Sequence, residues 1–450
     1  MSDFYFTPQE LARWTGGRWS REPAAPIIGF AIDSRALAWG ELFIALPGER
    51  ADGHAFLEVA ASRGAAGALV RRGTRCDGLP LLEVEDPKQA LVAMARAHRD
   101  RLAGAFVAIT GSSGKTSVKE MTADLLSLAG PTARTRGNWN NELGLPLSLL
   151  SMKPSDRFGV FEVGMSHPGE LAPLCALLRP HVSVVTNVGP VHIEFFESEE
   201  AIAHEKAEVL RALGEEGLAV LSSDDPWFAL LRAEVKSELK TVSLRRDADY
   251  RIEAGASPLF VVTEWASGES VAMEAPIPGA HVLTNAGLAI AVARHYGVAW
   301  DAIREGLRAF HPPGMRWQRQ RVGEVLFIND AYNANPMSMI AALEAFAATP
   351  VAGRRWLVLG AMRELGLRAE EEHVKLGSAV AEGPWAGLVT VGAEGEWIRR
   401  GAQSRGFQRV HGADDPVAAA RVLKDLIRAG DAVLLKASRG VQLEMVLSGL

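Results

Sequence analysis

The stretch Phe106-Val107-Ala108-Ile109-Thr110-Gly111-Ser112-Ser113-Gly114-Lys115-Thr116 decides the fold of this chain. It begins as a short apolar run, breaks into a glycine-rich turn and continues into a helical pattern that ends at Gly130. Apolar residues follow the turn at spacings of three and four, namely Val118, Met121, Leu125 and Leu128. A strand, a glycine turn and a helix N-terminus in this order are typical of a loop that binds nucleotide phosphates.

The chemistry of this turn predicts ATP or GTP as its ligand. Glycines let backbone N–H groups approach phosphate oxygens, and the helix N-terminus adds partial positive charge. We expect Lys115 to contact the β- and γ-phosphates and the Thr116 hydroxyl to bind Mg²⁺. The general motif has four residues between its glycines, whereas Gly111 and Gly114 have two between them and Ile109 stands where the first glycine would be. The prediction therefore rests on the flanking strand and helix as well as on the motif. The residues expected to hold the phosphates are Gly111, Ser112, Ser113, Gly114, Lys115 and Thr116.

The composition indicates an ordinary globular protein of about two to four domains, with 450 residues, 48% of them hydrophobic and 23% charged. A net charge of −6 argues against a nucleic-acid or anionic-membrane partner, because such partners call for clustered Lys and Arg. Cys76 and Cys175 cannot form a disulfide framework, and residues 1–4 lack the pattern of a signal peptide. Polar residues interrupt the most apolar long stretch, 280–298, so we expect no transmembrane segment and a cytoplasmic location.

Changes of pattern along the chain predict an α/β protein of three domains. Residues 1–103 combine short apolar runs with one helical pattern and predict a small N-terminal α/β domain. Residues 104–313 alternate strand-like runs with helical stretches, which is typical of a mainly parallel sheet covered by helices on both faces. Residues 314–450 repeat the alternation and predict a C-terminal Rossmann-like domain. The strand-like runs of the last two domains are 106–110, 157–163, 181–187, 218–221, 324–328, 356–359, 388–391 and 432–435.

Polar residues follow the strands of the predicted central sheet. Glu162 ends one apolar run, Thr186 and Asn187 end the next, and His192 follows shortly after. Because ligands of open parallel sheets bind outside the carboxyl ends of the strands, we expect these residues to share an edge with the phosphate loop. Taken singly, Glu162 and His192 fit a solvated strand end or loop equally well, and only their joint placement favours a site.

A lysine interrupts the apolar stripe of the helix expected over residues 201–213. Lys206 aligns with Ile202, Val209 and Leu213, which should face the core. Two explanations are open at this point. Either the stem lies along apolar surface and the ammonium reaches water, or the lysine is desolvated, has a low pKa and takes part in chemistry.

Separated motifs give nearly the whole chain a resemblance to the Mur ligase family. They are Asp33-Ser34-Arg35, Thr110-Gly111 with Gly114-Lys115-Thr116, Gly137-Asn138 with Asn140-Asn141, Glu162 with Gly164-Met165, Thr186-Asn187-Val188-Gly189 with His192, Gly279 with His281 and Asn285, Gly314-Met315-Arg316, Asp330-Ala331-Tyr332-Asn333-Ala334-Asn335-Pro336, and Lys436 with Ser438-Arg439. The stretch 330–336 is the most specific and resembles the members that add D-alanyl-D-alanine. Ala361 and Ala437 depart from the family pattern, which commonly has Asp and Gly there, and both belong to the C-terminal side of the expected pocket.

The resemblance implies an ATP-dependent amide-bond ligase of cytoplasmic peptidoglycan precursor synthesis. The carboxylate of UDP-N-acetylmuramoyl-tripeptide would attack the γ-phosphate of ATP to give an acyl phosphate and ADP, and the amine of D-alanyl-D-alanine would displace phosphate. Bringing a carboxylate to a triphosphate requires concentrated positive charge in a dry site. The implied partners are these two substrates with ATP and Mg²⁺. We expect a monomer without a nucleic-acid partner.

The same resemblance implies roles for residues that match the family motifs. For catalysis these are Lys115, His192 and Lys206. For metal binding, Thr116 and Glu162 would hold one Mg²⁺, and His192 with the carbamate of Lys206 a second. For the nucleotide, Asn285 would contact adenine, Arg316 the γ-phosphate and Asp330 the ribose. For the other substrates the residues are Ser34, Arg35, Asn138, Asn140, Tyr332 and Asn333, and the domain that carries Ser34 and Arg35, residues 1–103, would bind the UDP-muramoyl end. Burial of Lys206 also favours the carbamate directly, since a lowered pKa raises the fraction of neutral amine that reacts with CO₂.

Three other functions compete with this interpretation. A P-loop kinase shares the phosphate loop but needs neither Lys206 nor the stretch 330–336. A ligase similar to folylpolyglutamate synthase shares much of the middle domain but gives no reason for the domain that carries Asp33-Ser34-Arg35. A non-enzymatic nucleotide-binding regulator would bind ATP without turnover.

Overall fold

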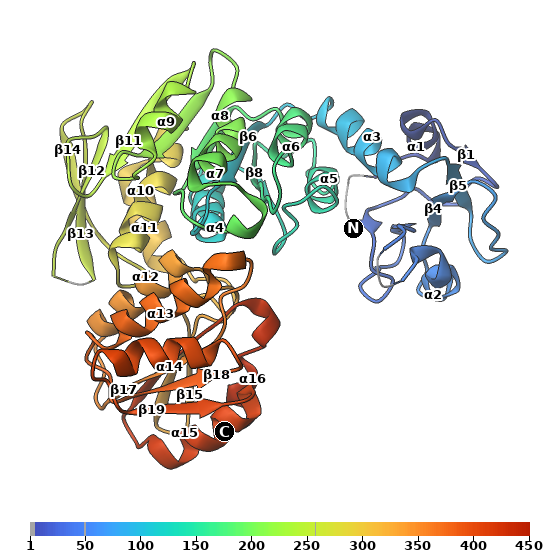
Figure 1. Cartoon of the computed structure of the whole chain (residues 1–450). Helices are drawn as coiled ribbons and strands as arrows, with labels where there is room; N and C mark the ends of the chain where they lie inside the picture. The colour runs from blue at the N-terminus through green and yellow to red at the C-terminus, as the bar shows by residue number, and fades with distance from the viewer. Residues whose placement is uncertain (1–4, 49–50, 257) are drawn as a thin grey trace.

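The structure is a computed structural model, and it describes residues 5–48, 51–256 and 258–450. In this part of the chain the strands form three sheets, each with its own helices, and Figure 1 shows the three groups following one another along the chain. The α/β class with a mainly parallel central sheet is confirmed. No helix of the described ranges is long and apolar enough to cross a membrane.

The N-terminal sheet has the strand order β1-β5-β4-β3-β2, with parallel pairs except at β1. Its elements are α1 (Pro8–Thr15), β1 (Arg18–Trp19), β2 (Phe30–Ala31), β3 (Leu42–Ile44), the 3-10 helix η1 (Gly53–Phe56), α2 (Leu57–Ser62), β4 (Gly67–Arg71), β5 (Leu81–Val84) and α3 (Pro87–Arg99). Local sequence explains the helix starts. Thr7 and Glu10 form a capping box at α1, and the Asp86 side chain caps α3, where proline occupies the first turn.

The central sheet places the glycine turn at its middle. Strand β6 (Ala105–Thr110) pairs in parallel with β8 (Phe158–Glu162) on one side and β9 (Val182–Val185) on the other. The full order is β14-β13-β12-β11-β10-β9-β6-β8-β7. Other elements of this region are α4 (Lys115–Ser127), β7 (Thr132–Arg134), α5 (Gly144–Leu150), α6 (Leu171–Leu178), η2 (Ile193–Phe195), β10 (Leu218–Ser222), α9 (Phe228–Ala233), β11 (Glu238–Ser243), α10 (Ala280–His295) and α11 (Trp300–Ala309).

Two details of this region differ from the sequence expectation. The helix expected over residues 201–213 is divided into α7 (Glu199–Lys206) and α8 (Glu208–Arg211). Leu128 follows the end of α4 and is 52% exposed, so it does not continue the buried stripe of that helix. In both cases the helix ends earlier than the periodicity suggests, because a regular spacing of apolar residues does not fix where backbone hydrogen bonds stop.

An antiparallel extension of the central sheet was missed by the sequence analysis. It consists of β12 (Tyr250–Ala254), β13 (Leu259–Glu264) and β14 (Glu269–Glu274). In β14 only alternate residues are buried, as expected for a strand with one solvated face. Strands β12 and β14 lack the continuous apolar runs that revealed the buried parallel strands, whereas the run 259–262 of β13 was overlooked.

The C-terminal sheet has the order β15-β16-β20-β17-β18-β19, in which only the pair of β15 and β16 is antiparallel among those described. Its elements are β15 (Gln318–Val322), β16 (Val325–Asn329), α12 (Pro336–Ala348), β17 (Arg355–Leu359), η3 (Gly366–Arg368), α13 (Ala369–Val380), β18 (Gly387–Val391), α14 (Gly395–Ser404), β19 (Val410–Ala413), α15 (Pro416–Leu426), β20 (Ala432–Lys436), η4 (Arg439–Val441) and α16 (Met445–Ser448). The division of the chain at residues 103 and 313 stays our proposal for the domain boundaries.

Candidate active site

The phosphate loop joins the end of β6 to the start of α4, and glycine is required at two of its positions. Gly114 has a φ of 80°, and a β-carbon there would lie 2.7 Å from the side-chain oxygen of Asn285. Gly111 has a φ of 148°, and a β-carbon would collide with the Thr186 hydroxyl. The close approach of these side chains therefore depends on the glycines of the motif.

The end of β9 holds the loop in shape. The N–H of Ser113 donates to the side-chain oxygen of Asn187 at 2.9 Å, and the N–H of Ser112 donates to the Asn187 carbonyl at 2.9 Å. The Thr186 hydroxyl donates to the Ser113 carbonyl. The predicted sharing of one sheet edge by Thr186, Asn187 and the loop is confirmed.

Thr116 and Glu162 meet beside the loop. The Thr116 hydroxyl donates to one carboxylate oxygen of Glu162 at 2.7 Å, and the Asn140 amide donates to the other at 2.7 Å. Glu162 is buried. Hydroxyl and carboxylate oxygens are the ligands that Mg²⁺ prefers, so this pair fits the predicted metal. Within the described ranges no three His, Cys, Asp or Glu side chains cluster as a metal site, so a bound Mg²⁺ would also need phosphate oxygens or water.

Lys115 and Lys206 both have lowered pKa values. Lys206 ends α7 and is 2% exposed, and burial together with the charge of Lys115 holds its pKa well below the usual value. The alternative that its ammonium reaches water is therefore wrong. Burial also lowers the pKa of Lys115, an effect that Glu162 opposes and Arg316 reinforces. The Lys115 ammonium donates to the Gly111 carbonyl at 2.8 Å.

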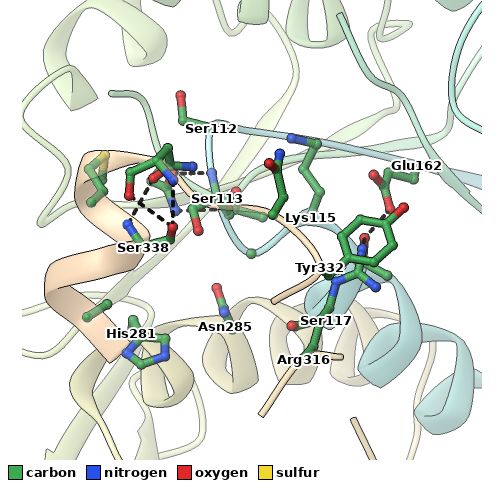
Figure 2. Close-up of a pocket in the computed structure, with 18 of the residues that line it drawn as sticks. Ser112, Ser113, Lys115, Ser117, Glu162, His281, Asn285, Arg316, Tyr332 and Ser338 are labelled. Atoms are coloured by element: carbon green, nitrogen blue, oxygen red, sulfur yellow. Dashed lines mark hydrogen bonds between the residues drawn. The ribbon is translucent and has the colours of Figure 1, made fainter. Parts of the chain in front are cut away.

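A cleft of about 640 Å³ lies between the phosphate loop, the N-terminal end of α10 and the loop after β16. Figure 2 shows Lys115, Glu162, Arg316 and Tyr332 on one side of it and His281 and Ser338 on another. The sequence-predicted residues that line it are Ser112, Ser113, Gly114, Lys115, Thr116, Asn138, Asn140, Glu162, His192, Asn285, Arg316, Asp330, Tyr332 and Asn333. Four others are not part of this lining. Gly111 and Lys206 are buried outside it, and Ser34 and Arg35 belong to the N-terminal sheet region.

The motif Asp33-Ser34-Arg35 of the N-terminal region contains an exposed ion pair. The Arg35 guanidinium donates to both carboxylate oxygens of Asp33, at 2.9 and 2.8 Å, and these hydrogen bonds lower the pKa of Asp33 to about 2. The Arg35 side chain is 86% exposed, whereas Ser34 is buried. Arg35 is thus held by its neighbour and still open to a ligand.

Asp330 connects the C-terminal sheet to the segment that carries Arg316. One carboxylate oxygen accepts the Trp317 N–H at 3.0 Å, and the other accepts the Lys436 ammonium at 2.6 Å. Lys436 is buried at the end of β20. Ala361 and Ala437 are also buried, outside the cleft lining, so the two departures from the family pattern do not place a side chain in the cleft.

His192 meets a residue that the sequence analysis did not select. Its Nδ1 lies 2.5 Å from a carboxylate oxygen of Glu364, and this contact lowers the pKa of Glu364. A second ion pair, Arg368 with Glu199 at 3.3 Å, joins the same two regions. Glu364 lies five residues after the end of β17, so the strand-end rule could have drawn attention to it.

Asp225 and His281 were also absent from the predicted site. Asp225 follows β10, accepts the N–H groups of Val188 and Trp227 at 2.9 and 2.8 Å, and has a pKa raised by burial. His281 lies one turn before Asn285 on α10, and burial lowers its pKa to about 4. Its Nδ1 has no hydrogen-bond partner among the described residues. The strand-end rule would have found Asp225, whereas His281 was named in a family motif with Asn285 but was given no role.

A glycine turn between a parallel strand and a helix, facing a cleft closed by a second α/β sheet, defines a nucleotide-binding α/β protein. The sequence pattern of the Mur ligase middle domain matches residues 109–293, and that of the Mur ligase glutamate ligase domain matches residues 315–439. The chain belongs to the Mur ligase family.

Individual relatives are similar over almost the whole chain. UDP-N-acetylmuramoyl-tripeptide–D-alanyl-D-alanine ligase of Bacillus subtilis is 34% identical, with 94% of this chain and 93% of that protein covered. The enzyme of the same name from Escherichia coli is 35% identical, with 93% and 92% covered. Among solved structures, MurF from Acinetobacter baumannii has a TM-score of 0.88 at 30% identity, covering 99% and 98%. MurF ligase from Thermotoga maritima in complex with ADP has a TM-score of 0.80 at 31% identity, covering 94% and 96%.

Proposed function

We propose that this chain is the ligase that joins D-alanyl-D-alanine to UDP-N-acetylmuramoyl-tripeptide with ATP, in the synthesis of peptidoglycan precursors. The observation that carries the proposal is the position of the stretch 330–336, which contributes Asp330, Tyr332 and Asn333 to the same cleft as the phosphate loop. The names of the relatives from Bacillus subtilis and Escherichia coli support the choice of substrates.

The reaction has two steps. A carboxylate oxygen of the tripeptide attacks the γ-phosphorus of ATP, the bond to the bridging oxygen breaks, and ADP leaves with that electron pair. The amine of D-alanyl-D-alanine then attacks the acyl carbon, the bond to phosphate breaks, and the amine proton is lost as the amide forms. The first step brings a carboxylate to a triphosphate, and cationic side chains in a site of low water content make this approach of two anions possible.

The chain supplies this positive charge from two directions. Lys115 and the N-terminus of α4 lie on the side of the central sheet, and the Arg316 guanidinium reaches the same place, where it donates to the Thr116 hydroxyl at 3.0 Å. We assign the phosphates to the loop and the γ-phosphate to Arg316. Asn285 is assigned to the adenine and Asp330 to the ribose by the family resemblance, and both residues line the cleft.

The first metal assignment uses the Thr116 and Glu162 oxygens beside the loop, and the second uses the His192 ring nitrogen and Lys206. Thr116 and Glu162 would hold one Mg²⁺, and His192 with a carbamate on Lys206 would hold a second. Bound Mg²⁺ neutralises phosphate charge during phosphoryl transfer. The carbamate forms when the neutral amine attacks CO₂ and releases a proton, and the lowered pKa of buried Lys206 favours the neutral amine.

The remaining assignments concern the muramoyl substrate and the dipeptide. Ser34 and Arg35 would bind its UDP end, and Asn138 and Asn140 the part that enters the cleft. Asn140 already donates to Glu162, so it would link substrate and metal ligand. Tyr332 and Asn333 are assigned to the substrate side of the cleft. Since Ser34 and Arg35 lie outside the cleft, we infer that the regions close around the substrate.

We place the reaction in the cytoplasm and assign no disulfide to the chain. ATP and nucleotide-linked sugars are cytoplasmic metabolites, and Cys76 and Cys175 are both free thiols in the structure.

The test is a phosphate-release assay on the purified protein with ATP, Mg²⁺ and D-alanyl-D-alanine. The UDP-muramoyl tripeptide carries either meso-diaminopimelate or lysine as its third residue, in separate reactions. Phosphate release is expected to need all components and to yield the pentapeptide, identified by its mass. A single amino acid should replace the dipeptide poorly. A phosphorylated product without an amide would identify a kinase, and ATP binding without turnover a regulator.

A further inference from the structure

Arg316 lies in a short segment whose backbone is strained on both sides. Met315 has a φ of 57° and Trp317 a φ of 56°, in the left-handed region that residues with a β-carbon avoid. Two hydrogen bonds between this segment and the loop after β16 hold this backbone conformation. The Tyr332 N–H donates to the Met315 carbonyl at 3.1 Å, and the Trp317 N–H donates to the Asp330 carboxylate at 3.0 Å.

The side chain of Arg316 also contacts the loop after β16, through the ring of Tyr332. The Cζ of Arg316 lies 3.6 Å from the centre of the Tyr332 ring, so the guanidinium stacks on the ring face. Its Nη2 donates to the Thr116 hydroxyl at 3.0 Å. Figure 2 shows the ring and the guanidinium side by side, close to Glu162. The loop after β16 therefore holds Arg316 in two ways. Hydrogen bonds fix the backbone on either side of Arg316, and the Tyr332 ring fixes its guanidinium.

Stacking on Tyr332 leaves the N–H groups of the Arg316 guanidinium available to bind phosphate oxygens. The N–H groups of arginine point outward in the plane of the group, so a ring on one face does not compete with phosphate oxygens for them. The ring attracts the cation and restricts a side chain that otherwise loses several rotatable bonds of freedom on binding. An arginine held in this way needs less ordering when the nucleotide arrives.

We propose that Tyr332 is a positioning residue for Arg316, which holds the guanidinium at the phosphate loop before the nucleotide binds. The proposal rests on the proposed function, in which Arg316 contacts the γ-phosphate. It gives Tyr332 a role that acts through Arg316, in addition to the substrate side of the cleft where it was assigned above. The phenolic oxygen has no part in stacking, so phenylalanine preserves the role and leucine removes it.

The test measures binding of a non-hydrolysable ATP analogue and of ADP by calorimetry, with the purified full chain. Tyr332→Leu should weaken binding of the analogue by about fivefold, while the affinity for ADP stays unchanged, because ADP lacks the γ-phosphate. Tyr332→Phe should bind both as the unaltered protein does. In an Arg316→Ala background, Tyr332→Leu should have no further effect on the analogue. Trp265→Leu is the matched control, since Trp265 is 73% exposed and lies outside the cleft lining.

The outcomes separate this proposal from the proposed function. Nucleotide affinities do not depend on the acceptor, so the coupling of Tyr332 with Arg316 can be observed even where no tripeptide is ligated. Independent, additive effects of the two substitutions on analogue binding would overturn the proposal, and so would equal losses with phenylalanine and leucine. A rise in the KM for D-alanyl-D-alanine with unchanged analogue affinity would make Tyr332 a substrate contact only. Thermal unfolding of each variant identifies any that fail to fold.

Discussion

The Thr116 hydroxyl and the Glu162 carboxylate are joined by a hydrogen bond of 2.7 Å across two elements, the first turn of α4 and the end of β8. They are 46 residues apart in the sequence. Strand β8 is the direct neighbour of β6, so the sheet order alone brings the carboxylate to the phosphate loop. The order of the strands therefore places both proposed ligands of the first Mg²⁺ next to each other.

Glu162→Gln should raise the Mg²⁺ concentration needed for half-maximal phosphate release by about tenfold. The amide keeps the size of the side chain but removes the negative charge that would hold the cation. Magnesium titrations at saturating ATP measure the effect. Glu170→Gln, a half-buried carboxylate on the same cleft, is the control and should titrate as the unaltered protein does. Equal Mg²⁺ requirements for Glu162→Gln and the control would contradict the assignment.

Lys115→Ala should lower the rate of phosphate release by at least about a hundredfold while leaving the fold intact. The ammonium bonds only the Gly111 carbonyl among the contacts described, and its charge is directed to the expected phosphates. The rate and the thermal unfolding midpoint are measured together. Lys375→Ala, which removes an exposed lysine of α13, should change neither. Retention of more than a few per cent of the activity would exclude the loop from the mechanism.

Lys206→Ala should abolish activity, and short carboxylic acids that fit the vacated volume should restore part of it. The reason is that the carbamate supplies an anion which alanine lacks and a small carboxylate can replace. A second readout uses isotope-labelled bicarbonate, whose carbamate signal should appear in NMR spectra of the unaltered protein and disappear in the variant. Full activity of the variant, or an unmodified amine in a metal-loaded and nucleotide-bound crystal, would refute the carbamate.

Asp431→Ala should destabilise the chain by about 3 kcal/mol. The carboxylate is 2% exposed, and its oxygens accept hydrogen bonds from Arg354 at 2.8 Å and from the Trp356 indole at 3.1 Å. Burial alone would raise its pKa, but these hydrogen bonds outweigh burial and lower it below 3.8. Its contribution is therefore complete above the unfolded pKa and is lost as the pH falls through the lower folded pKa.

Urea denaturation at several pH values measures this effect. The difference in unfolding free energy between the unaltered protein and Asp431→Ala should be constant at neutral pH and shrink in acid. Asp425→Ala removes an exposed carboxylate of the same region and should leave the curve unchanged. A difference that grows as the pH falls would contradict the lowered pKa.

The buried parallel strands were predictable from the sequence because both of their faces are apolar. The runs at 106–110, 356–359, 388–391 and 432–435 all correspond to strands. Strands β12 and β14 escaped detection because one face meets water and polar residues break their apolar runs, whereas the apolar run 259–262 of β13 was overlooked. The expected monomer stays a prediction.

The site was predictable where it follows the ends of adjacent strands. Glu162 and Thr186 were found in this way, and the periodicity of its helix found Lys206. Contacts between distant segments were not predictable in the same manner. The approach of Glu364 to His192 and the stacking of Tyr332 on Arg316 depend on how the C-terminal sheet packs on the central one, which no local pattern encodes.

The separation of Ser34 and Arg35 from the cleft has a consequence for the order of cell-wall assembly. Under the proposed function the nucleotide end of the precursor is held on one sheet and its reactive carboxylate on another. The closed enzyme would then select precursors by length, because a stem that is too short could not reach the phosphate loop while Ser34 and Arg35 hold its UDP end. A free peptide with the correct terminal chemistry would lack the anchor altogether. The spacing of the two regions would thus admit only precursors to which the earlier residues have already been added.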